Sequence, residues 1–257
     1  MSGSPYPRSL HGKVALVIGG SGGIGATAGR MLAEGGAQVA LTHRPGTRAR
    51  EAAELAASLP GDGGGHAAFP ADVADTGSLI ALRDAVAGRY RRLDILVNAA
   101  GFTKPVPHAD LEALTDDLID DMFRVNWRGQ FAAIRTFAPL LKASGDGLVV
   151  SISSIAAFTG VGSSIAYCAA KAGIDVMTKS LARALAPEIR VMAVSPGVVD
   201  TGFVPSRAAD FNSKVAAATP LRRIASADDI AAAIVACATH LGYSTGATIV
   251  VDGGRAL

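Results

Sequence analysis

The stretch VALVIGGSGGIG, residues 14–25, decides the fold of this chain. Five apolar residues that favour a buried strand run directly into a glycine-rich turn, and a segment of helical period follows. The amide groups at such a helix N-terminus lack partners, the helix dipole is positive there, and glycine lets an anion approach the backbone closely. The stretch therefore predicts a phosphate-binding turn between a first strand and a first helix.

Two overlapping glycine patterns fit this turn. Gly20, Gly22 and Gly25 have the G-x-G-x-x-G spacing of dinucleotide sites, whereas Gly19, Gly23 and Gly25 have a G-x-x-x-G-x-G spacing. The residues by themselves leave the register open. The expected contacts with a dinucleotide are Gly19, Ser21, Gly22, Gly23, Ile24 and Gly25.

Strand-like and helix-like segments alternate along the rest of the chain, which is typical of βαβ units and a parallel sheet. Predicted strands are residues 14–18, 38–42, 66–69, 95–98, 148–152, 191–194 and 248–251, and predicted helices are residues 24–33, 48–58, 78–90, 117–141, 165–185 and 228–240. We expect one α/β domain, residues 12–257, with a Rossmann-type doubly wound parallel sheet of about seven strands and helices on both faces. Residues 1–11 are expected to be a flexible tail, residues 61–65 a surface loop, and residues 201–220 a candidate lid.

Composition argues against several classes of protein. The net charge is +2 with no long basic run, so we expect no nucleic acid partner. The longest apolar stretch, residues 230–238, falls well short of the roughly 20 residues that span a bilayer, so we expect no membrane anchor. Cys168 and Cys237 are not spaced as a metal pair or redox motif, and we expect a cytoplasmic protein without a metal.

The end of the second predicted strand indicates which dinucleotide the turn binds. An NAD site usually has an acidic residue about 20 positions after the glycines, but the chain reads Leu41-Thr42-His43-Arg44. Arg44 offers a planar, permanently charged fork for a 2′-phosphate, and His43 could add a donor. We therefore expect NADP(H), the alternative being that Arg44 is a solvated charge at the start of a loop.

Tyr167 and Lys171 are four residues apart in a predicted helix, so they share one face. A phenol has a pKa near 10, and a nearby ammonium is expected to lower it toward the working pH. Tyr167 could then act as general acid or base toward a carbonyl or alcohol oxygen. Ser154 follows the fifth strand and could donate a hydrogen bond to the same oxygen, although Ser153 competes with it on spacing alone.

With these residues the chain resembles the short-chain dehydrogenase/reductase family from Gly12 to Gly254. The matching blocks are the glycine turn, Asp72-Val73, residues 96–101 (LVNAAG), Asn126, Ser154, Tyr167-x-x-x-Lys171, residues 195–197 (SPG) and residues 252–254 (DGG). The resemblance implies a catalytic set of Asn126, Ser154, Tyr167 and Lys171, because the serine of the family lies 13 residues before its tyrosine. It further implies that Lys171 binds the nicotinamide ribose and that Asn126 holds a water in a proton relay.

The same resemblance implies the remaining cofactor contacts. Asp72 and Val73 would flank the adenine, Asn98, Ala99 and Gly101 would shape the cofactor floor, and the nicotinamide end would meet Pro196, Gly197, Val199 and Thr201. Three positions depart from the common family pattern, namely Ile18, Ala99 and Met192, each of which replaces a polar side chain with an apolar one. None belongs to the catalytic set, so activity is still expected.

The expected reaction interconverts a ketone and a secondary alcohol, as in the 3-oxoacyl-(acyl carrier protein) reductase and secondary-alcohol dehydrogenase branch. Residues 155–165 with Val198, Val199 and Phe203 should line the substrate side, which predicts a small apolar carbonyl or alcohol substrate. The resemblance gives little support to an acyl carrier protein as a partner, because Gly145 and Glu188 stand where such reductases usually have basic residues. The family also implies a homotetramer. The alternative function is a non-enzymatic NADP(H)-binding redox sensor or scaffold.

Overall fold

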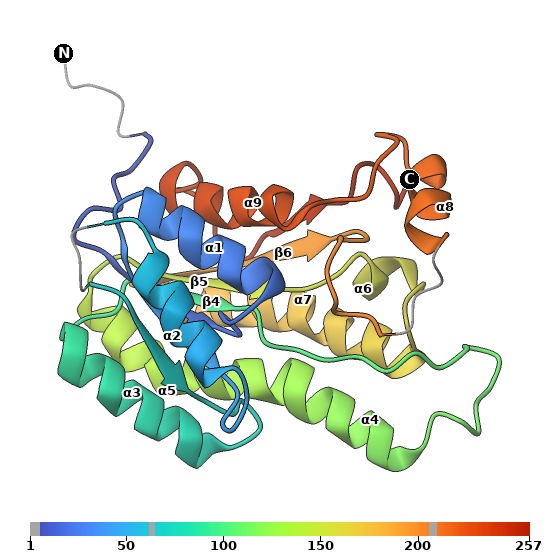
Figure 1. Cartoon of the computed structure of the whole chain (residues 1–257), viewed down its shortest axis with the longest axis horizontal. Coiled ribbons are helices and arrows are strands. Elements are labelled where there is room, and N and C mark those ends of the chain that lie inside the picture. The colour runs from blue at the N-terminus through green and yellow to red at the C-terminus, as the bar shows by residue number, and fades with distance from the viewer. Residues whose placement is uncertain (1–5, 62–64, 206–209) are drawn as a thin grey trace.

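A computed structural model describes residues 6–61, 65–205 and 210–257 of the chain (Figure 1). Seven parallel strands form one sheet in the order β3-β2-β1-β4-β5-β6-β7. The strands are β1 Val14–Ile18, β2 Gln38–His43, β3 Ala67–Pro70, β4 Ile95–Asn98, β5 Gly147–Ile152, β6 Ile189–Pro196 and β7 Thr248–Val251. The predicted Rossmann-type fold is confirmed, and its topological switch point lies between β1 and β4.

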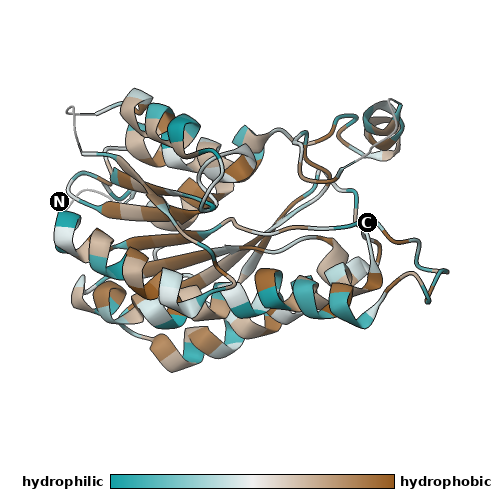
Figure 2. Ribbon diagram, turned by 60° about the horizontal axis from the view of Figure 1, so that its bottom comes forward, coloured by the Kyte–Doolittle hydropathy of each residue, from teal (hydrophilic) through white to brown (hydrophobic). Residues whose placement is uncertain are grey.

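Helices cover both faces of the sheet, with hydrophobic strands sandwiched between them (Figure 2). The helices are α1 Gly23–Glu34, α2 Ala49–Ser58, α3 Thr76–Tyr90, α4 Asp116–Phe123, η1 Arg124–Arg128, α5 Gly129–Ala143, α6 Ala156–Thr159, α7 Ile165–Leu185, α8 Phe211–Ala218 and α9 Ala227–Thr239. Helices α1, α2 and α9 bury one core against the sheet, and α3, α5 and α7 bury another. Because both faces are covered, the strands are near-continuous apolar runs instead of alternating ones.

Three helical features differ from the sequence prediction. The segment predicted as one helix over 117–141 is divided by the π-helical turn η1, and the short helices α6 and α8 were not predicted. Helix α8 lies inside the segment 201–220 that was expected to be an irregular lid. The predicted span of α7 is confirmed, and Ser164 caps it by accepting a hydrogen bond from the Tyr167 amide at 3.1 Å.

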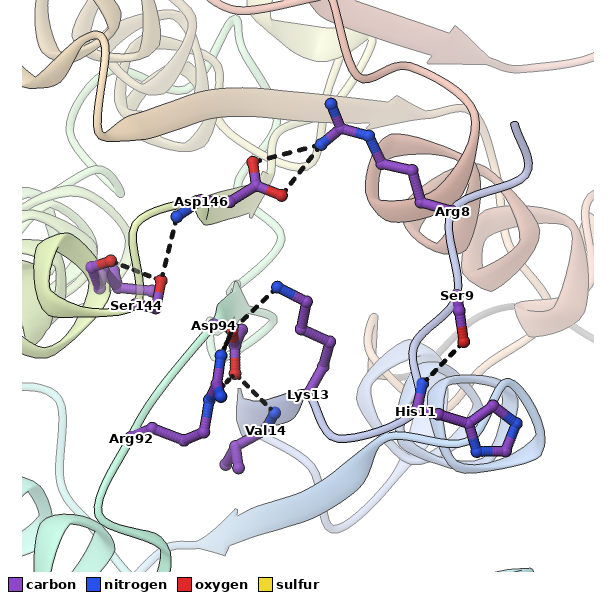
Figure 3. Close-up of polar contacts among 10 residues, drawn as sticks. Arg8, Ser9, His11, Lys13, Val14, Arg92, Asp94, Ser144 and Asp146 are labelled. Carbon is purple, nitrogen blue, oxygen red and sulfur yellow. Dashed lines mark hydrogen bonds and ion pairs between the residues drawn. The ribbon is translucent and has the colours of Figure 1, made fainter. Parts of the chain in front are cut away.

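The described part of the expected N-terminal tail is attached to the domain. The Arg8 guanidinium pairs with Asp146 at 3.0 Å (Figure 3). The Arg8 amide also donates to the Thr239 carbonyl at 2.8 Å, and Leu10 is buried. This differs from the expectation of a loose segment through His11. Residues 1–5, 62–64 of the predicted surface loop and 206–209 of the candidate lid lie outside the described residues.

No helix among the described residues combines the length and apolarity needed to cross a membrane.

Asp94 anchors the amino ends of the central strands, on the edge opposite the glycine turn. Its carboxylate accepts hydrogen bonds from Arg92, from Lys13 at 3.2 Å and from the Val14 amide at 2.9 Å (Figure 3). Burial by itself would raise the pKa of Asp94, but the hydrogen bonds from Arg92, Val14 and Lys13 outweigh it and hold the pKa below its ordinary value. The ionised carboxylate therefore stabilises the packing of β1 beside β4.

We predict that Asp94→Asn lowers the free energy of unfolding at pH 7 by about 2–4 kcal/mol, because a buried carboxylate and its charged donors lose their pairing. Since the folded-state pKa is lowered, the difference should be full above about pH 4 and shrink as the pH falls through that pKa. Urea titrations across this pH range measure it. Asp84→Asn, which alters an exposed ion pair with Arg83, should change stability by under about 1 kcal/mol; equal effects of the two variants would contradict the prediction.

Candidate active site

The glycine turn packs its backbone against the chain that leaves β4. A Cβ atom on Gly19 would lie 2.6 Å from the Ala100 nitrogen, and one on Gly25 would lie 2.2 Å from the Gly19 carbonyl oxygen. Gly19 also has φ +80°, in the left-handed region that favours glycine. The turn is therefore built without side chains, and it presents the N-terminus of α1, whose N-cap residue Gly22 makes no side-chain capping bond.

A cavity of about 1320 Å³ extends along the carboxyl ends of the strands from this turn. It is larger than a site for one small ligand, typically 300–1,000 Å³, and has room for a dinucleotide and a second molecule. Most of the predicted site residues lie in its wall: Gly19, Ser21, Gly22, Gly23, Ile24, Gly25, Ala99, Gly101, Ser154, Tyr167, Lys171, Pro196, Gly197, Val199 and Thr201. Six others, His43, Arg44, Asp72, Val73, Asn98 and Asn126, do not line this cavity.

The basic residue nearest the glycine turn is Arg48, which the sequence reasoning missed. Arg48 lines the cavity, and a Cβ atom on Gly22 would lie 2.8 Å from its Nη1 atom. Arg44 is exposed outside the wall, and the buried His43 directs Nδ1 to the carbonyls of Arg44 and Thr47, both at 3.1 Å. His43 therefore holds the loop after β2, while Arg48 carries charge to the cavity. The sequence feature that could have pointed to Arg48 is its position four residues after Arg44, in the same loop.

Asp72, Val73 and Asn98 have identifiable packing or capping contacts beside the cavity. The Asp72 carboxylate accepts from the Ala74 amide at 2.8 Å, and Val73 packs where α5 begins. Asn98 donates to the Ser151 hydroxyl at 3.4 Å, and its buried Oδ1 atom has no hydrogen-bond partner among the described residues. These contacts stabilise the turns after β3 and β4.

Asn126 lies fully buried in the π-helical turn and clamps the chain that leaves β4. Its Oδ1 atom accepts from the Phe102 amide at 3.1 Å, and its Nδ2 atom donates to the carbonyls of Phe102 at 2.9 Å and Met122 at 3.0 Å. A Cβ atom on Gly101 would lie 2.6 Å from the Asn126 Oδ1 atom, so a glycine is required there. Single π turns inside helices often occur at functional sites.

The structure separates the two serines that spacing could not. Ser153 is buried and donates to the Lys171 carbonyl at 3.3 Å. Ser154 lies in the cavity wall, close enough to Tyr167 for its hydroxyl to lower the pKa of the phenol. Ser154 is therefore the serine whose hydroxyl is placed beside the phenol.

Tyr167 and Lys171 face the cavity from one side of α7. The Lys171 Nζ atom lies 5.6 Å from the centroid of the Tyr167 ring and donates to the Ile152 carbonyl at 2.7 Å. The ring of Phe203 lies 6.2 Å from that of Tyr167 and covers it from the segment after β6. Phenol, ammonium and hydroxyl thus come together from α7 and the end of β5.

Burial shifts the pKa values of both groups. It raises the pKa of Tyr167 to about 12, against the opposing hydrogen bond from Ser154. It lowers the pKa of Lys171 to about 8, against the opposing charge of Asp175. The expectation that the pKa of Tyr167 lies lowered toward the working pH is therefore wrong for this chain by itself, because desolvation of the phenolate is the largest effect on it. At neutral pH both Tyr167 and Lys171 carry their protons.

The wall on the far side of Tyr167 includes expected and unexpected residues. Of the expected residues, Ile155, Ala156, Thr159, residues 161–163, Val198, Val199 and Phe203 line the cavity, whereas residues 157, 158, 160, 164 and 165 do not. Phe102, Thr103, residues 105–108, Phe211, Arg255 and Ala256 also contribute, although no motif pointed to them. They come from the loop after β4, from the start of α8 and from the C-terminal turn, whose proximity depends on the tertiary fold. Among the described residues there is no group of three or more side chains that could hold a metal ion.

The site fits a dinucleotide on the structural evidence. Its glycine turn leaves no room for side chains, the N-terminus of α1 faces the cavity, and Arg48 supplies a cation beside Gly22. These are features that bind the pyrophosphate of a dinucleotide. The three proton-bearing groups lie in the same cavity, beyond the strands that flank the switch point.

The chain is similar to known proteins over nearly its whole length. A family model described as Enoyl-(Acyl carrier protein) reductase matches residues 19–256. The chain is 36% identical over 249 residues to granaticin polyketide synthase putative ketoacyl reductase 2 of Streptomyces violaceoruber, covering 95% of this chain and 96% of that one. It is 37% identical over 249 residues to D-threitol dehydrogenase of Mycolicibacterium smegmatis, covering 95% and 93% of the two chains.

Two further similarities extend the comparison. The chain is 36% identical over 247 residues to cis-4-hydroxycyclohexanecarboxylate dehydrogenase of Sinomonas cyclohexanicum, covering 94% and 96% of the two chains. The crystal structure of a putative short-chain dehydrogenase/reductase from Burkholderia xenovorans superposes with a TM-score of 0.88 at 32% identity and covers 96% of this chain and 99% of that one.

The buried ammonium of Lys171 generates a prediction about stability. Lys171→Met should raise the free energy of unfolding at pH 7 by about 1–3 kcal/mol, because the ammonium is desolvated and its hydrogen bond to Ile152 offsets only part of that cost. Between pH 8 and 10.5 the unfolded wild type keeps a proton that the folded state has lost, so wild-type stability rises and the advantage of the variant shrinks. Denaturant titrations at pH 7 and pH 10 measure both effects.

The matched control for this prediction is Lys214→Met, since the side chain of Lys214 is largely exposed. Its stability should stay within about 0.5 kcal/mol of wild type and show no such dependence on pH. A Lys171→Met variant that is less stable than wild type at both pH values would show that the ammonium is not under strain.

Proposed function

From the premise that the chain belongs to the short-chain dehydrogenase/reductase family, we propose that it is an NADP(H)-dependent enzyme that interconverts a ketone and a secondary alcohol with Tyr167 as general acid and base. The family makes it an oxidoreductase of alcohol or ketone substrates. The observation that carries the finer proposal is the meeting of Tyr167, Ser154 and Lys171 in the cavity wall that also contains the glycine turn.

The proposed cofactor contacts follow the cavity from one edge to the other. The glycine turn, with Ser21 and Ile24, would hold the pyrophosphate, and Ala99 and Gly101 would lie under the nicotinamide ribose. Pro196, Gly197, Val199 and Thr201 would meet the nicotinamide end, and Asp72, Val73 and Asn98 would support the adenine side. When bound, the nicotinamide supplies or accepts the hydride.

Tyr167 provides the proton in the proposed reduction. With a pKa near 12 the phenol is fully protonated at neutral pH, and it donates its proton to the carbonyl oxygen as negative charge develops there. The Ser154 hydroxyl lies in the same cavity wall and would donate to the same oxygen, a bond that strengthens as the oxygen becomes anionic. In the reverse direction the phenolate takes the proton back from the alcohol.

Lys171 and Asn126 complete the proposed proton relay. An ammonium beside Tyr167 stabilises the phenolate that proton transfer leaves, and Lys171 remains mostly protonated below its pKa of about 8. Asn126 acts by holding the Phe102 backbone, and the resemblance assigns its turn a water that links Lys171 to solvent. Through this relay Tyr167 would be reprotonated after each reduction.

The preference for NADP(H) is proposed on charge. Arg48 lies in the wall beside Gly22, the exposed Arg44 directly follows β2, and no acidic residue of the described chain lines the cavity. An arginine fork binds phosphate through two parallel hydrogen bonds. We therefore propose that Arg48 is the main residue that binds the 2′-phosphate. Arg44 would be a second cation, and His43 would stabilise the loop that carries both arginines.

The proposed substrate is a small carbonyl or alcohol compound. The relatives named above are reductases and dehydrogenases, and one is a ketoacyl reductase of a polyketide synthase. A carrier protein is not part of the proposal, because Gly145 and Glu188 stand where basic residues would receive it. We also propose a homotetramer and a cytoplasmic location, both drawn from the family resemblance.

Tyr167→Phe tests the chemistry. We predict that kcat for ketone reduction falls by about 10²–10⁴-fold, the usual contribution of a general acid, because the ring stays and only the proton donor is lost. NADPH oxidation followed by absorbance over a panel of simple ketones measures the rate, and NADPH binding by fluorescence should stay within about twofold.

Tyr243→Phe is the matched control because Tyr243 is fully exposed, and it should retain wild-type rates. Turnover of Tyr167→Phe equal to that of wild type would refute its role. Tight NADPH binding without turnover of any ketone would favour a sensor or scaffold instead.

Arg48→Gln tests the cofactor preference. We predict an increase of about 10–100-fold in the Kd for NADPH, which corresponds to one charge-assisted hydrogen-bond pair, and little change in the Kd for NADH. Arg44→Gln should have a smaller effect, and Arg50→Gln, an exposed residue paired with Glu54, should have none. A wild type that binds NADH better than NADPH would overturn the charge argument.

A further inference from the structure

The cavity continues past Tyr167 into a region beyond the proposed cofactor contacts. It is lined there by Phe102, Thr103, residues 105–108, Thr159, residues 161–163, residues 203–205, Phe211 and the C-terminal pair Arg255 and Ala256. The segments 102–108 and 159–163 are tied together by a hydrogen bond between the Thr103 and Ser163 hydroxyls and by another from the Val106 amide to the Ser163 carbonyl. Most of this lining is apolar, so its few polar groups decide what binds.

The charges of the whole wall have one sign. Among the described residues that line the cavity, Arg48, Lys171 and Arg255 are cations and none is Asp or Glu. Arg48 lies at the glycine turn and Lys171 beside Tyr167, and both have a proposed part in the reaction. Arg255 has none, although arginine keeps its charge at any ordinary pH.

Arg255 lies on the opposite side of the catalytic groups from Arg48. Arg48 follows β2, Ser154 follows β5 and Arg255 follows β7, in a sheet whose order is β3-β2-β1-β4-β5-β6-β7. The turn that carries Arg255 packs against the chain after β6, since a Cβ atom on Gly197 would lie 2.9 Å from Asp252. Arg255 is therefore at the substrate end of the cavity, away from the phosphates of a dinucleotide.

The turn around Arg255 is held in place by Asp252. The Asp252 carboxylate accepts from the Gly254 amide at 2.9 Å and from the Ala256 amide at 2.8 Å, and the Asp252 carbonyl accepts from the Arg255 amide at 3.3 Å. The Asp252 carboxylate is therefore bonded to the backbone amides of the two residues that flank Arg255. The Leu221 amide also donates to the Gly253 carbonyl at 3.1 Å, which fixes the turn to the segment after α8.

The guanidinium of Arg255 makes no hydrogen bond or ion pair with any described residue, and it is only partly exposed. Other arginines of this chain have carboxylate partners, for example Arg30 with Glu34, Arg92 with Asp94 and Arg223 with Asp229. A half-buried cation on a fixed turn, in a wall whose described residues include no carboxylate, favours an anionic ligand.

We propose that Arg255 binds a carboxylate of the substrate, so that this enzyme acts on oxo acids and the corresponding hydroxy acids. The proposal rests on the proposed function and deepens it. The planar guanidinium fork matches a carboxylate, and the apolar walls accommodate the carbon chain between carboxylate and carbonyl. β5 and β7 are two strand spacings apart, roughly 10 Å, a gap that a chain of a few carbons and the arginine side chain span together. This replaces the expectation of an uncharged apolar substrate, which considered only residues 155–165, Val198, Val199 and Phe203.

The test compares acids with their neutral amides at three chain lengths. The probes are 4-oxopentanoate, 5-oxohexanoate and 6-oxoheptanoate and the three matching amides, each reduced with NADPH by wild type, Arg255→Gln, Arg255→Lys and Arg50→Gln. At one length or more, the wild-type KM for the acid should be at least about tenfold below that for the amide.

The variants separate ion pairing from structure. Arg255→Gln should raise the KM for the acid by about 10–100-fold, while kcat and the KM for the amide stay within about twofold. Arg255→Lys keeps the charge without the fork and should restore part of the loss. The control Arg50→Gln should behave as wild type. Equal KM values for acid and amide at every length, or an Arg255→Gln variant that keeps the preference for acids, would overturn the proposal.

A binding measurement distinguishes this failure from failure of the proposed function. Calorimetric titration of the six probes into protein saturated with NADP⁺ measures the preference for acids without turnover. If wild type binds an acid more tightly than its amide and Arg255→Gln does not, the carboxylate site is supported even when no ketone is reduced. In that case the proposed reaction is the part that fails. Turnover of cyclohexanone that depends on Tyr167, together with no preference for acids in either assay, would retain the function and reject the role of Arg255.

Discussion

The whole site depends on the close approach of two backbone segments where β1 and β4 end side by side. The Ala99 amide donates to the Ile18 carbonyl at 2.9 Å, and a side chain on Gly19 would collide with Ala100. Because the chain leaves β1 toward one face of the sheet and β4 toward the other, a crevice opens at this point. The glycines bring the N-terminus of α1 to that crevice, and the Asn126 side chain holds the Phe102 backbone on its other side.

Buried ionisable groups at the two ends of the strands differ in how many polar partners they have. At the amino ends Asp94 is buried but fully paired, so its charge supports the packing of β1 and β4. At the carboxyl ends Tyr167 and Lys171 are buried with fewer partners, and burial moves their pKa values away from the ordinary ones. Sites that need a reactive proton commonly accept such a cost in stability, which the rest of the fold must offset.

Local sequence was a good guide wherever one segment carries the whole signal. The span of α7 was predicted correctly because its apolar period and its Ser164 cap lie within the segment itself. Helix α8 and the π turn at Arg124–Arg128 were missed, since neither has a distinct local pattern. The expectation that His43 and Arg44 face the phosphate followed from their position after β2. In the structure, His43 instead bonds to the carbonyls of Arg44 and Thr47 in the following loop, and this loop brings Arg48 close to Gly22.

The sequence by itself determined the fold class, the glycine turn and the pairing of Tyr167 with Lys171, because strand period, turn chemistry and helix spacing act over a few neighbouring residues. Local spacing left Ser153 and Ser154 open and the family resemblance favoured Ser154, but only the tertiary structure shows the physical difference, because it directs the Ser153 hydroxyl to the Lys171 carbonyl and places Ser154 in the cavity wall. It also brought Arg255 from the end of the chain into the cavity wall. Such contacts join strands distant in sequence, and burial, which sets the pKa values, exists only once those strands are packed together.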